Sequence, residues 1–230
     1  MDFQRARSGE QRDQRRRVIL ATASAMLAEM SVAEISLNEL SRRVGLAKSN
    51  VLRYFESREA VLLQLLNDEI DAWIAALDLS GISSDADIAA RANLLAQALA
   101  NSLAARATLC DLISSQAAVL ERNVSADVVL QHKRAVNVSV GVLGELLTSS
   151  LPEMPQTDIY HLIVTLFLTA AGAWPHGQPT EALLAAYAAD PGIGAHSTDF
   201  VAFMRNSLEL TILGLHARRS CSEDKSNVFE

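Results

Sequence analysis

Apolar residues recur every three or four positions along most of the chain, which is the spacing of one face of an α-helix. The first such segment runs from about Arg12 to Met30, and arginines gather at its N-terminal end. The apolar face of this segment consists of Ile19, Ala23, Met26, Leu27 and Met30. The pattern therefore predicts an amphipathic helix that begins near residue 12.

A short helix is predicted next. Ser36 and Glu39 stand in the S-x-x-E arrangement, in which the serine oxygen accepts from the glutamate amide and the glutamate side chain binds back to the serine amide. The helix should therefore begin at Leu37. Its apolar positions are Leu37, Leu40 and Val44. Gly45 follows where a residue in the left-handed conformation would end the helix.

A second short helical segment is predicted from Lys48 to Phe55, with Val51 and Phe55 on its apolar side. Its other sides carry hydrogen-bond donors at Lys48, Ser49, Asn50, Arg53 and Tyr54. Two short helices joined by a glycine-containing turn form a helix-turn-helix, here packed by Leu40, Val44, Leu46, Val51 and Phe55. Donors on one side of such a helix fit the major groove of DNA, where they reach base edges and phosphates.

A longer helix should follow, capped by Ser57. Its apolar stripe consists of Leu62, Leu65, Leu66 and Trp73. Arg58 occupies its first position, where a cation opposes the positive end of the helix dipole. A phosphate outside the helix would compensate for this, so we expect Arg58 to bind DNA backbone.

The rest of the chain predicts further helices and no strand, so the expected fold class is all-α. Breaks are predicted at 79–84, near Arg106, and at 121–125, 150–157, 175–179 and 190–197. Residues 159–180 carry no formal charge, but their apolar part, Ile159 to Trp174, is only 16 residues long and is interrupted by polar residues. A bilayer needs about 20 residues, so we expect a core or dimer-interface helix and no membrane span.

Charge divides the chain into a basic head and an acidic body. Residues 1–58 hold eleven Lys and Arg against seven Asp and Glu, a net charge of +4, while residues 59–230 hold nine against twenty, a net charge of −11. Such a division suits a protein with one end that approaches a polyanion, although an ordinary arginine-rich tail would explain the N-terminal part equally well. The N-terminal segment lacks the apolar core of a signal peptide, so we expect a cytoplasmic protein.

Little in the sequence points to catalysis. Cys110 and Cys221 are far apart with no CxxC spacing, so no disulfide or zinc site is indicated, and we interpret Cys110 as a buried cysteine rather than a redox sensor. There is no HExxH, no GxSxG and no phosphate-binding glycine loop. Asp158 and His161 form only one of the two pairs that a di-iron bundle needs. We therefore expect no enzyme, no cofactor and no metal.

The segment from Ser36 to Leu66, SLNELSRRVGLAKSNVLRYFESREAVLLQLL, resembles the DNA-binding region of the TetR family of bacterial repressors. Matching positions are Ser36, Leu40, Gly45, Leu46, Asn50, Val51, Tyr54, Phe55, Ser57, Arg58 and Glu59. Three residues depart from the family pattern: Ala47 in place of a serine cap, Ser49 in place of a small residue, and Leu52 in place of a tyrosine that contacts phosphate. These departures bear on operator affinity. The DNA-binding candidates are Ser36, Lys48, Ser49, Asn50, Arg53, Tyr54 and Arg58.

The resemblance implies a three-helix helix-turn-helix domain followed by a larger helical domain for ligand binding and dimerisation. We expect a flexible basic arm over 1–11, the DNA-binding domain over 12–72 with its core at 37–56, the larger domain over 73–218, and a disordered tail over 219–230. A homodimer is expected through the last two long helices, roughly Thr157 to Trp174 and Ser197 to Arg218. In that case Leu162, Leu166, Leu208, Leu210 and Leu213 divide between the dimer interface and the core of one subunit.

The expected mechanism is repression at a palindromic double-stranded DNA operator, relieved by a small-molecule inducer. An aromatic wall with polar anchors for this inducer could come from His132, Asn137, Phe167, Trp174 and His176. An activator that uses the same DNA contacts is one alternative. A helix-turn-helix module that contacts another protein is a second alternative, which weak and salt-independent DNA binding would reveal.

Overall fold

The computed structural model describes residues 2–194 and 198–226, and every element in this part of the chain is helical, as predicted. The elements are α1 (Asp2–Leu27), α2 (Leu37–Val44), α3 (Lys48–Val51), α4 (Arg58–Ala76), α5 (Ile88–Ala104), α6 (Ala107–Ser115), the π-helical turn η1 (Gln116–Leu120), α7 (Ala126–Ser150), α8 (Gln156–His176), α9 (Glu181–Ala189), α10 (Pro191–Gly194) and α11 (Phe200–Ser226).

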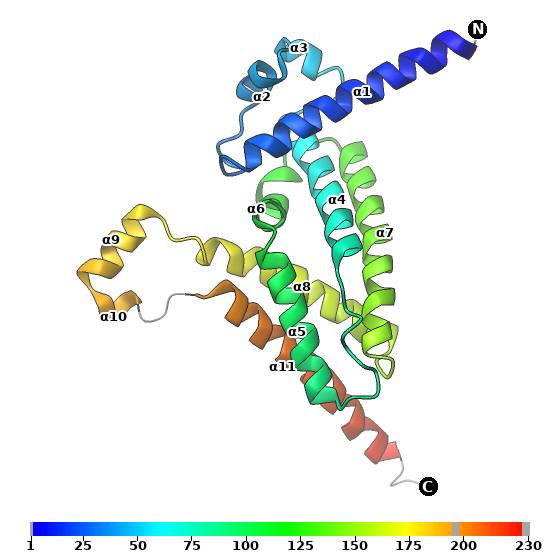
Figure 1. Ribbon diagram of the computed structural model, residues 1–230, viewed down its shortest axis with the longest axis vertical. Coiled ribbons are helices and arrows are strands. Elements are labelled where there is room, and N and C mark those ends of the chain that lie inside the picture. The colour runs from blue at the N-terminus through cyan, green and yellow to red at the C-terminus, as the bar shows by residue number, and fades with distance from the viewer. Residues whose placement is uncertain (1, 195–197, 227–230) are drawn as a thin grey trace.

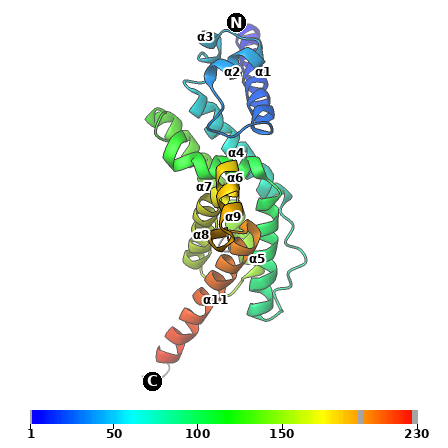
Figure 2. The ribbon, with the colours of Figure 1, turned by 90° about the vertical axis from the view of Figure 1, so that its left-hand side faces the viewer.

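Figure 1 shows three parts: a head, a body and an arm. The head consists of α1, α2, α3 and the start of α4, and the body contains α4 to α8 and α11. Helix α4 begins in the head and runs down beside α7, so it belongs to both parts. The arm, α9 and α10, projects from the body between the end of α8 and the start of α11. In the second view the head lies above the body, and α11 extends below it (Figure 2).

Five of the six predicted breaks overlap loops between helices. The sixth, 190–197, contains the short helix α10 instead, and its residues 195–197 lie outside the described residues. Both ends of the chain differ from expectation, because helix continues into the segments predicted to be irregular. Helix α1 begins at Asp2, so the predicted flexible arm over 1–11 is helical from residue 2 onward. Helix α11 continues to Ser226, eight residues beyond the predicted end at Arg218, and the rest of the predicted tail, 227–230, lies outside the described residues.

The helix ends in the head are fixed by the predicted caps. The Ser36 and Ser57 side-chain oxygens accept from the amides of Glu39 and Ala60, each at 3.1 Å. Gly45 has a φ of 73°, in the left-handed region. Its amide donates to Arg42 O, and the next amide donates to the carbonyl of residue 41. This pair of bonds satisfies the last carbonyls of α2 and turns the chain sharply toward α3.

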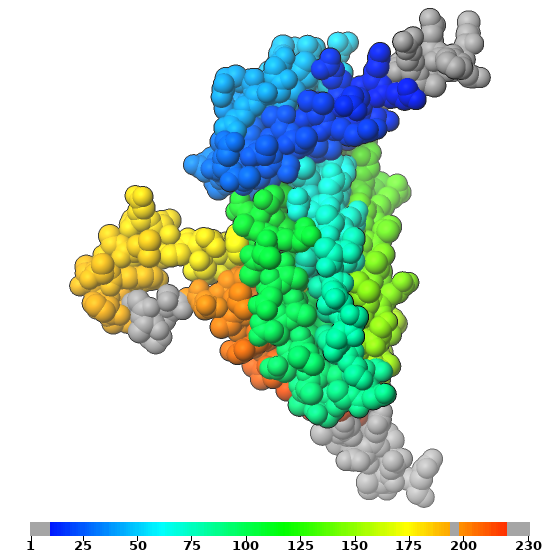
Figure 3. Space-filling model, in the orientation of Figure 1, coloured from blue at the N-terminus to red at the C-terminus, as the bar shows by residue number. Residues whose placement is uncertain are grey.

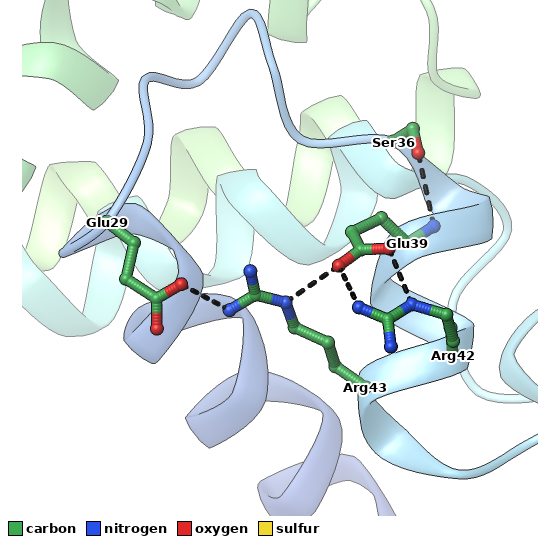
Figure 4. A network of polar contacts seen from close by, with 5 residues as sticks. All are labelled: Glu29, Ser36, Glu39, Arg42 and Arg43. Atoms are coloured by element: carbon green, nitrogen blue, oxygen red, sulfur yellow. Dashed lines mark hydrogen bonds and ion pairs between the residues drawn. The ribbon is translucent and has the colours of Figure 1, made fainter.

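The Glu39 carboxylate has different partners from those that the capping pattern predicts. Instead of binding back to the Ser36 amide, it accepts from Arg42 at 2.6 and 2.8 Å and from Arg43 at 2.9 Å (Figure 4). Arg43 also donates to Glu29 at 2.6 Å, which ties α2 to the end of α1. The two guanidinium groups lower the pKa of Glu39 to about 2, so its carboxylate stays charged in mildly acidic solution.

The body is held by a continuous apolar core. The predicted stripe of α4 is buried, and its Trp73 donates from Nε1 to Ser102 Oγ on α5 at 3.0 Å. Helix α5 buries Ala92, Ala96 and Ala100 and packs closely on α11. Arg91 at the start of α5 binds Glu153 through two 2.8 Å hydrogen bonds. No single helix in the described part is long and apolar enough to cross a membrane, whereas α5 and the Ala107–Leu120 segment pass the same test as a pair bent by 89°.

Polar contacts near the junction join the head and the first half of α4 to the rest of the body. The Ser125 amide at the start of α7 donates to Glu56 at 2.5 Å, and the Val32 amide donates to Asp111 of α6 at 2.8 Å. Between them, His132 of α7 is buried against Asn67 of α4. These contacts, on both sides of α4, fix how the head sits on the body.

The surroundings of His132 suit a neutral imidazole. Its Nδ1 lies 2.7 Å from Asn67 Oδ1, an acceptor, and its Nε2 lies 3.1 Å from Gln116 Nε2, a donor. A ring with its proton on Nδ1 satisfies both partners. Burial lowers the pKa of His132, neighbouring Lys133 lowers it further, and Glu121 opposes them. Protonation of the ring therefore conflicts with the folded structure.

We expect Gly45→Ala to destabilise the protein by roughly 1–2 kcal/mol, because an L-residue pays that cost in the left-handed region. No atom lies within 4 Å of the position of the added Cβ, so the cost comes from backbone conformation alone. Gly141→Ala in α7 is the matched control, since its Cβ also meets open space but the residue is helical. It should stabilise by about 0.5–1 kcal/mol. Urea unfolding measures both, and shifts of the same sign would contradict the prediction.

We expect the free energy of unfolding to fall as the pH drops through about 6.5, the usual histidine value, because the unfolded chain then binds a proton that buried His132 does not. Below the lowered pKa of His132 in the folded protein, both the folded and the unfolded chain bind the proton, so the free energy of unfolding should not fall further from this cause. His132→Gln removes this proton linkage and should make the pH dependence shallower between about pH 7.5 and about pH 5.5. Urea titrations at several pH values measure the slope, and equal slopes in both proteins would refute the assignment.

Candidate nucleic-acid interface

The predicted DNA-reading segment is shorter as a helix than the sequence suggested. The α-helix α3 ends at Val51, not at Phe55, and Ala47 before it provides no side-chain cap. Beyond Val51 the backbone keeps a helical course through turn bonds, among them Tyr54 N to Val51 O at 2.9 Å and Phe55 N to Val51 O at 3.1 Å. The donors from residue 48 to residue 54 therefore lie on one continuous, tightly wound segment.

This segment presents its polar side to solvent and its apolar side to the core. Val51 and Phe55 are buried, at 0% and 5% exposed. On the other side Tyr54 is half-buried, and the remaining candidates Lys48, Ser49, Asn50 and Arg53 are exposed. The burial pattern thus leaves four polar side chains free to meet a ligand.

Arg16 of α1 holds the end of this segment in place. Its Nη1 donates to the Tyr54 carbonyl at 2.6 Å, and its guanidinium carbon lies 4.1 Å from the centre of the Phe55 ring. The first contact satisfies a carbonyl at the end of the helical turn, and the second is a cation–π interaction. Burial, and then the nearby charge of Arg12, lower the pKa of Arg16. The sequence showed arginines at the start of α1 but not that this one turns inward.

A cationic groove lies between α1 and the DNA-reading segment. It has a volume of about 780 Å³. It is lined by Gln11, Arg12, Gln14, Arg15, Val18, Leu46, Asn50, Arg53 and Tyr54. These described residues include three arginines, all exposed, and no carboxylate. Arginine and amide donors without an opposing acid are the chemistry that binds phosphate.

Two other DNA-binding candidates have less freedom. Arg58 starts α4 as predicted, but its guanidinium binds the Ile35 carbonyl and the Glu59 carboxylate, the latter at 2.8 Å. It thereby links α4 to the loop before α2. Ser36 is exposed at the start of α2, where its oxygen caps the helix.

The five ligand-binding candidates do not share one cavity. His132 lines a cavity of about 280 Å³ between head and body, Trp174 one of about 420 Å³ beside α6, and His176 a groove of about 440 Å³ between α8 and α11. Phe167 packs edge-on against Trp73, with ring centres 6.0 Å apart, and Asn137 is exposed on α7. An aromatic wall with polar anchors is therefore absent from this set of described residues.

A different groove is the most apolar one along α4. It has a volume of about 380 Å³ and lies between the second half of α4 and α7. Its lining is Asp71, Ile74, Ala75, Leu77, Val138, Ser139, Val142 and Leu146. The sequence did not reveal this groove, because its walls consist mainly of apolar residues at ordinary helical spacing. Only the packing of α4 and α7 shows that a space remains between them.

Cys110 is buried among apolar side chains, and burial raises the pKa of its thiol to about 12. The thiolate, the reactive form, is therefore scarce at neutral pH. This geometry favours a packing role for Cys110.

The last two long helices expose an apolar face. Leu168 on α8 and Leu210 on α11 are 68% and 71% exposed, and Tyr160 and Phe203 on the same two helices are also exposed. Leu162, Leu166 and Leu208 are buried on the opposite faces, and Leu213 is partly buried. The two helices therefore have one face for the core and another without a partner in a single subunit.

Two family models match the chain: "Bacterial regulatory proteins, tetR family" over residues 19–65 and "Tetracyclin repressor-like, C-terminal domain" over residues 67–219. Curated relatives include the HTH-type transcriptional regulator EthR of Mycolicibacterium smegmatis, 37% identical over 75 residues, which are 33% of this chain and 35% of that protein. EthR of Mycobacterium tuberculosis is 42% identical over 55 residues, 24% of this chain and 26% of that protein. The chain thus matches about a third or less of these relatives' length.

Solved structures with a similar fold cover most of the chain. A possible TetR family transcriptional regulator from Streptomyces coelicolor has a TM-score of 0.55 at 20% identity and covers 88% of this chain and 98% of its own. FadR from Bacillus subtilis, in complex with stearoyl-CoA, has a TM-score of 0.51 at 15% identity, covering 85% and 96%. These likenesses show the fold. Because the two family models together span nearly all of residues 19–219, the chain belongs to the TetR family of bacterial transcriptional regulators.

Proposed function

We propose that the protein is a homodimeric repressor that binds a palindromic DNA operator and leaves it when a small molecule binds. The observation that carries this proposal is the exposed polar side of residues 48–54 next to a cationic groove. A segment of this size reads only a few base pairs, so a symmetric pair of heads is needed for useful specificity.

The proposed contacts divide into two kinds. Lys48, Ser49 and Asn50, at the start of the segment, read base edges in the major groove. Phosphates are bound by Arg53 and Tyr54, by the exposed arginines of the groove, Arg12 and Arg15, and by Ser36 at the start of α2. Arg58 acts indirectly, because its contacts with Ile35 and Glu59 position the head.

The proposed dimer forms through the exposed faces of α8 and α11. Large apolar side chains that are more than two-thirds exposed are unusual in a stable single subunit, and four helices from two subunits would cover them. A twofold axis that runs along the head-to-body direction places the two heads on the same side of the assembly, as a palindrome requires.

The proposed effector is an apolar small molecule in the groove between α4 and α7. A ligand there would change the spacing of the helix that enters the head, and it shifts the population only if it binds one spacing better than the other. The FadR neighbours from Bacillus subtilis and Thermus thermophilus are complexes with stearoyl-CoA and lauroyl-CoA, so acyl-CoA esters are suitable first probes. A thermal-shift screen would detect binding, since a ligand of the native form raises its stability.

Selection from a random duplex pool should yield a palindromic sequence whose binding weakens steeply with salt. Arg53→Ala in both subunits removes two proposed phosphate contacts, and each contact contributes about 0.9 to the slope of log K against log salt. Arg134→Ala, an exposed arginine on α7, is the matched control and should leave the slope unchanged. Weak binding to every duplex that does not depend on salt would instead indicate a protein-interaction module.

Asn50→Ala should reduce discrimination between operator and random DNA by about 1–3 kcal/mol, because a bidentate contact to a base edge is lost. Binding to random DNA should change little, since phosphate contacts remain. Competition binding with both duplexes measures the two effects. An equal loss on both duplexes would assign Asn50 to phosphate. A transcription assay from the selected operator distinguishes a repressor from an activator with the same contacts.

A further inference from the structure

The packing within one subunit does not explain why the arm formed by α9 and α10 is both apolar and exposed. Eight of the nine residues of α9, EALLAAYAA, are apolar, yet none of them is buried. Leu184 and Ile193 are each 52% exposed, and Leu183 is 38% exposed. Figures 1 and 3 show the arm standing away from the body, in contact with it only at its root.

An exposed helix of this length is not stable alone. Isolated helices shorter than about 12–15 residues are marginal in water, and α10 adds only a four-residue turn. The apolar side chains of α9 do not make up for this, because they stay exposed and gain little from burial. The arm therefore needs a surface to pack against.

The root of the arm consists of the packed ends of α8 and α11. Trp174 at the end of α8 packs edge-on against Phe200 at the start of α11, with ring centres 5.1 Å apart. A Cβ on Gly177, just after α8, would lie only 3.3 Å from Phe200 Cβ, so the two helix ends are in close contact. This packing brings the two ends of the arm together, and α9 and α10 project from them (Figure 1).

The charge of the arm excludes a polyanion as its partner. Residues 177–204 contain Glu181, Asp190 and Asp199 but no lysine or arginine. DNA backbone and anionic lipid surfaces both attract basic segments. A protein surface is the remaining partner.

We propose that each arm packs on the second subunit of the dimer. The arm joins α8 to α11, and at its root these helices expose Leu168 and Phe203, which line a groove of about 440 Å³. This groove belongs to the face through which the two subunits are proposed to meet, so a second copy lies next to the arm as soon as the dimer forms. The inference rests on the proposed dimer. Twofold symmetry makes the exchange reciprocal, so every arm contact occurs twice.

Sedimentation velocity over a range of concentrations tests the proposal with the full chain. Leu184→Glu places a charge in the proposed contact of both arms and should raise the dimer dissociation constant about tenfold or more. Leu94→Glu on α5 is the matched control, since Leu94 is 48% exposed on a helix that packs on α11 and α6, and it should leave the constant unchanged. Equal constants for the two variants would overturn the proposal.

Hydrogen exchange provides a second test that needs no change in the arm. Leu210→Glu on α11 should separate the subunits, and the α9 amides, slow to exchange in the unmodified dimer, should then exchange rapidly. Equally fast exchange in dimer and monomer would mean that the arm has no partner and would overturn the proposal. If Leu210→Glu leaves the dimer intact, the proposed α8–α11 interface fails, and the Leu184→Glu comparison still decides the role of the arm.

Discussion

A single turn of helix cannot hold its own shape, and the proposed base contacts start on such a turn, α3. Nucleating a helical turn fixes several backbone angles for one hydrogen bond, so α3 depends on its neighbours. Val51 and Phe55 anchor it in the core, Gly45 aims the chain toward it, and Arg16 binds its last carbonyl. These three constraints keep the apolar side of the segment packed on the core, so the polar side chains of residues 48–53 remain exposed.

The same helix that supplies Arg16 also supplies the cations of the groove. One turn of α1 places Arg12 and Arg15 outward and Arg16 inward, so the positions of the external charges and of the DNA-reading segment are fixed together. The head in turn is held on the body by the Glu56, Asp111 and His132 contacts on both sides of α4. In the proposed mechanism, a change in the spacing of α4 and α7 stretches the Asn67–His132 contact, which gives an effector a physical way to distinguish two positions of the head.

Features that depend on nearby residues could be predicted from the sequence, and those that depend on distant ones could not. The caps at Ser36 and Ser57 and the left-handed Gly45 follow from spacings of a few residues and were found where expected. The Arg16–Tyr54 contact joins residues 38 apart, and several arginines nearby were equally good candidates. Arg58 was predicted to bind phosphate from its place in the helix dipole, and its hydrogen bond to the Ile35 carbonyl, 23 residues away, could not be read from the sequence. The ligand candidates failed to converge for the same reason, because a cavity depends on how helices are separated in space.

The uneven charge also bears on how the protein approaches DNA. In the proposed dimer, two chains of −7 repel a polyanion at long range, but salt screens this repulsion beyond about 8–10 Å. Within that distance the local field matters, and it is attractive around Arg12, Arg15 and Arg53, where the described lining holds no carboxylate. An approach with the body or the acidic arm first meets repulsion at the same distance. The charge distribution therefore favours an encounter in which the heads lead, before any base is read.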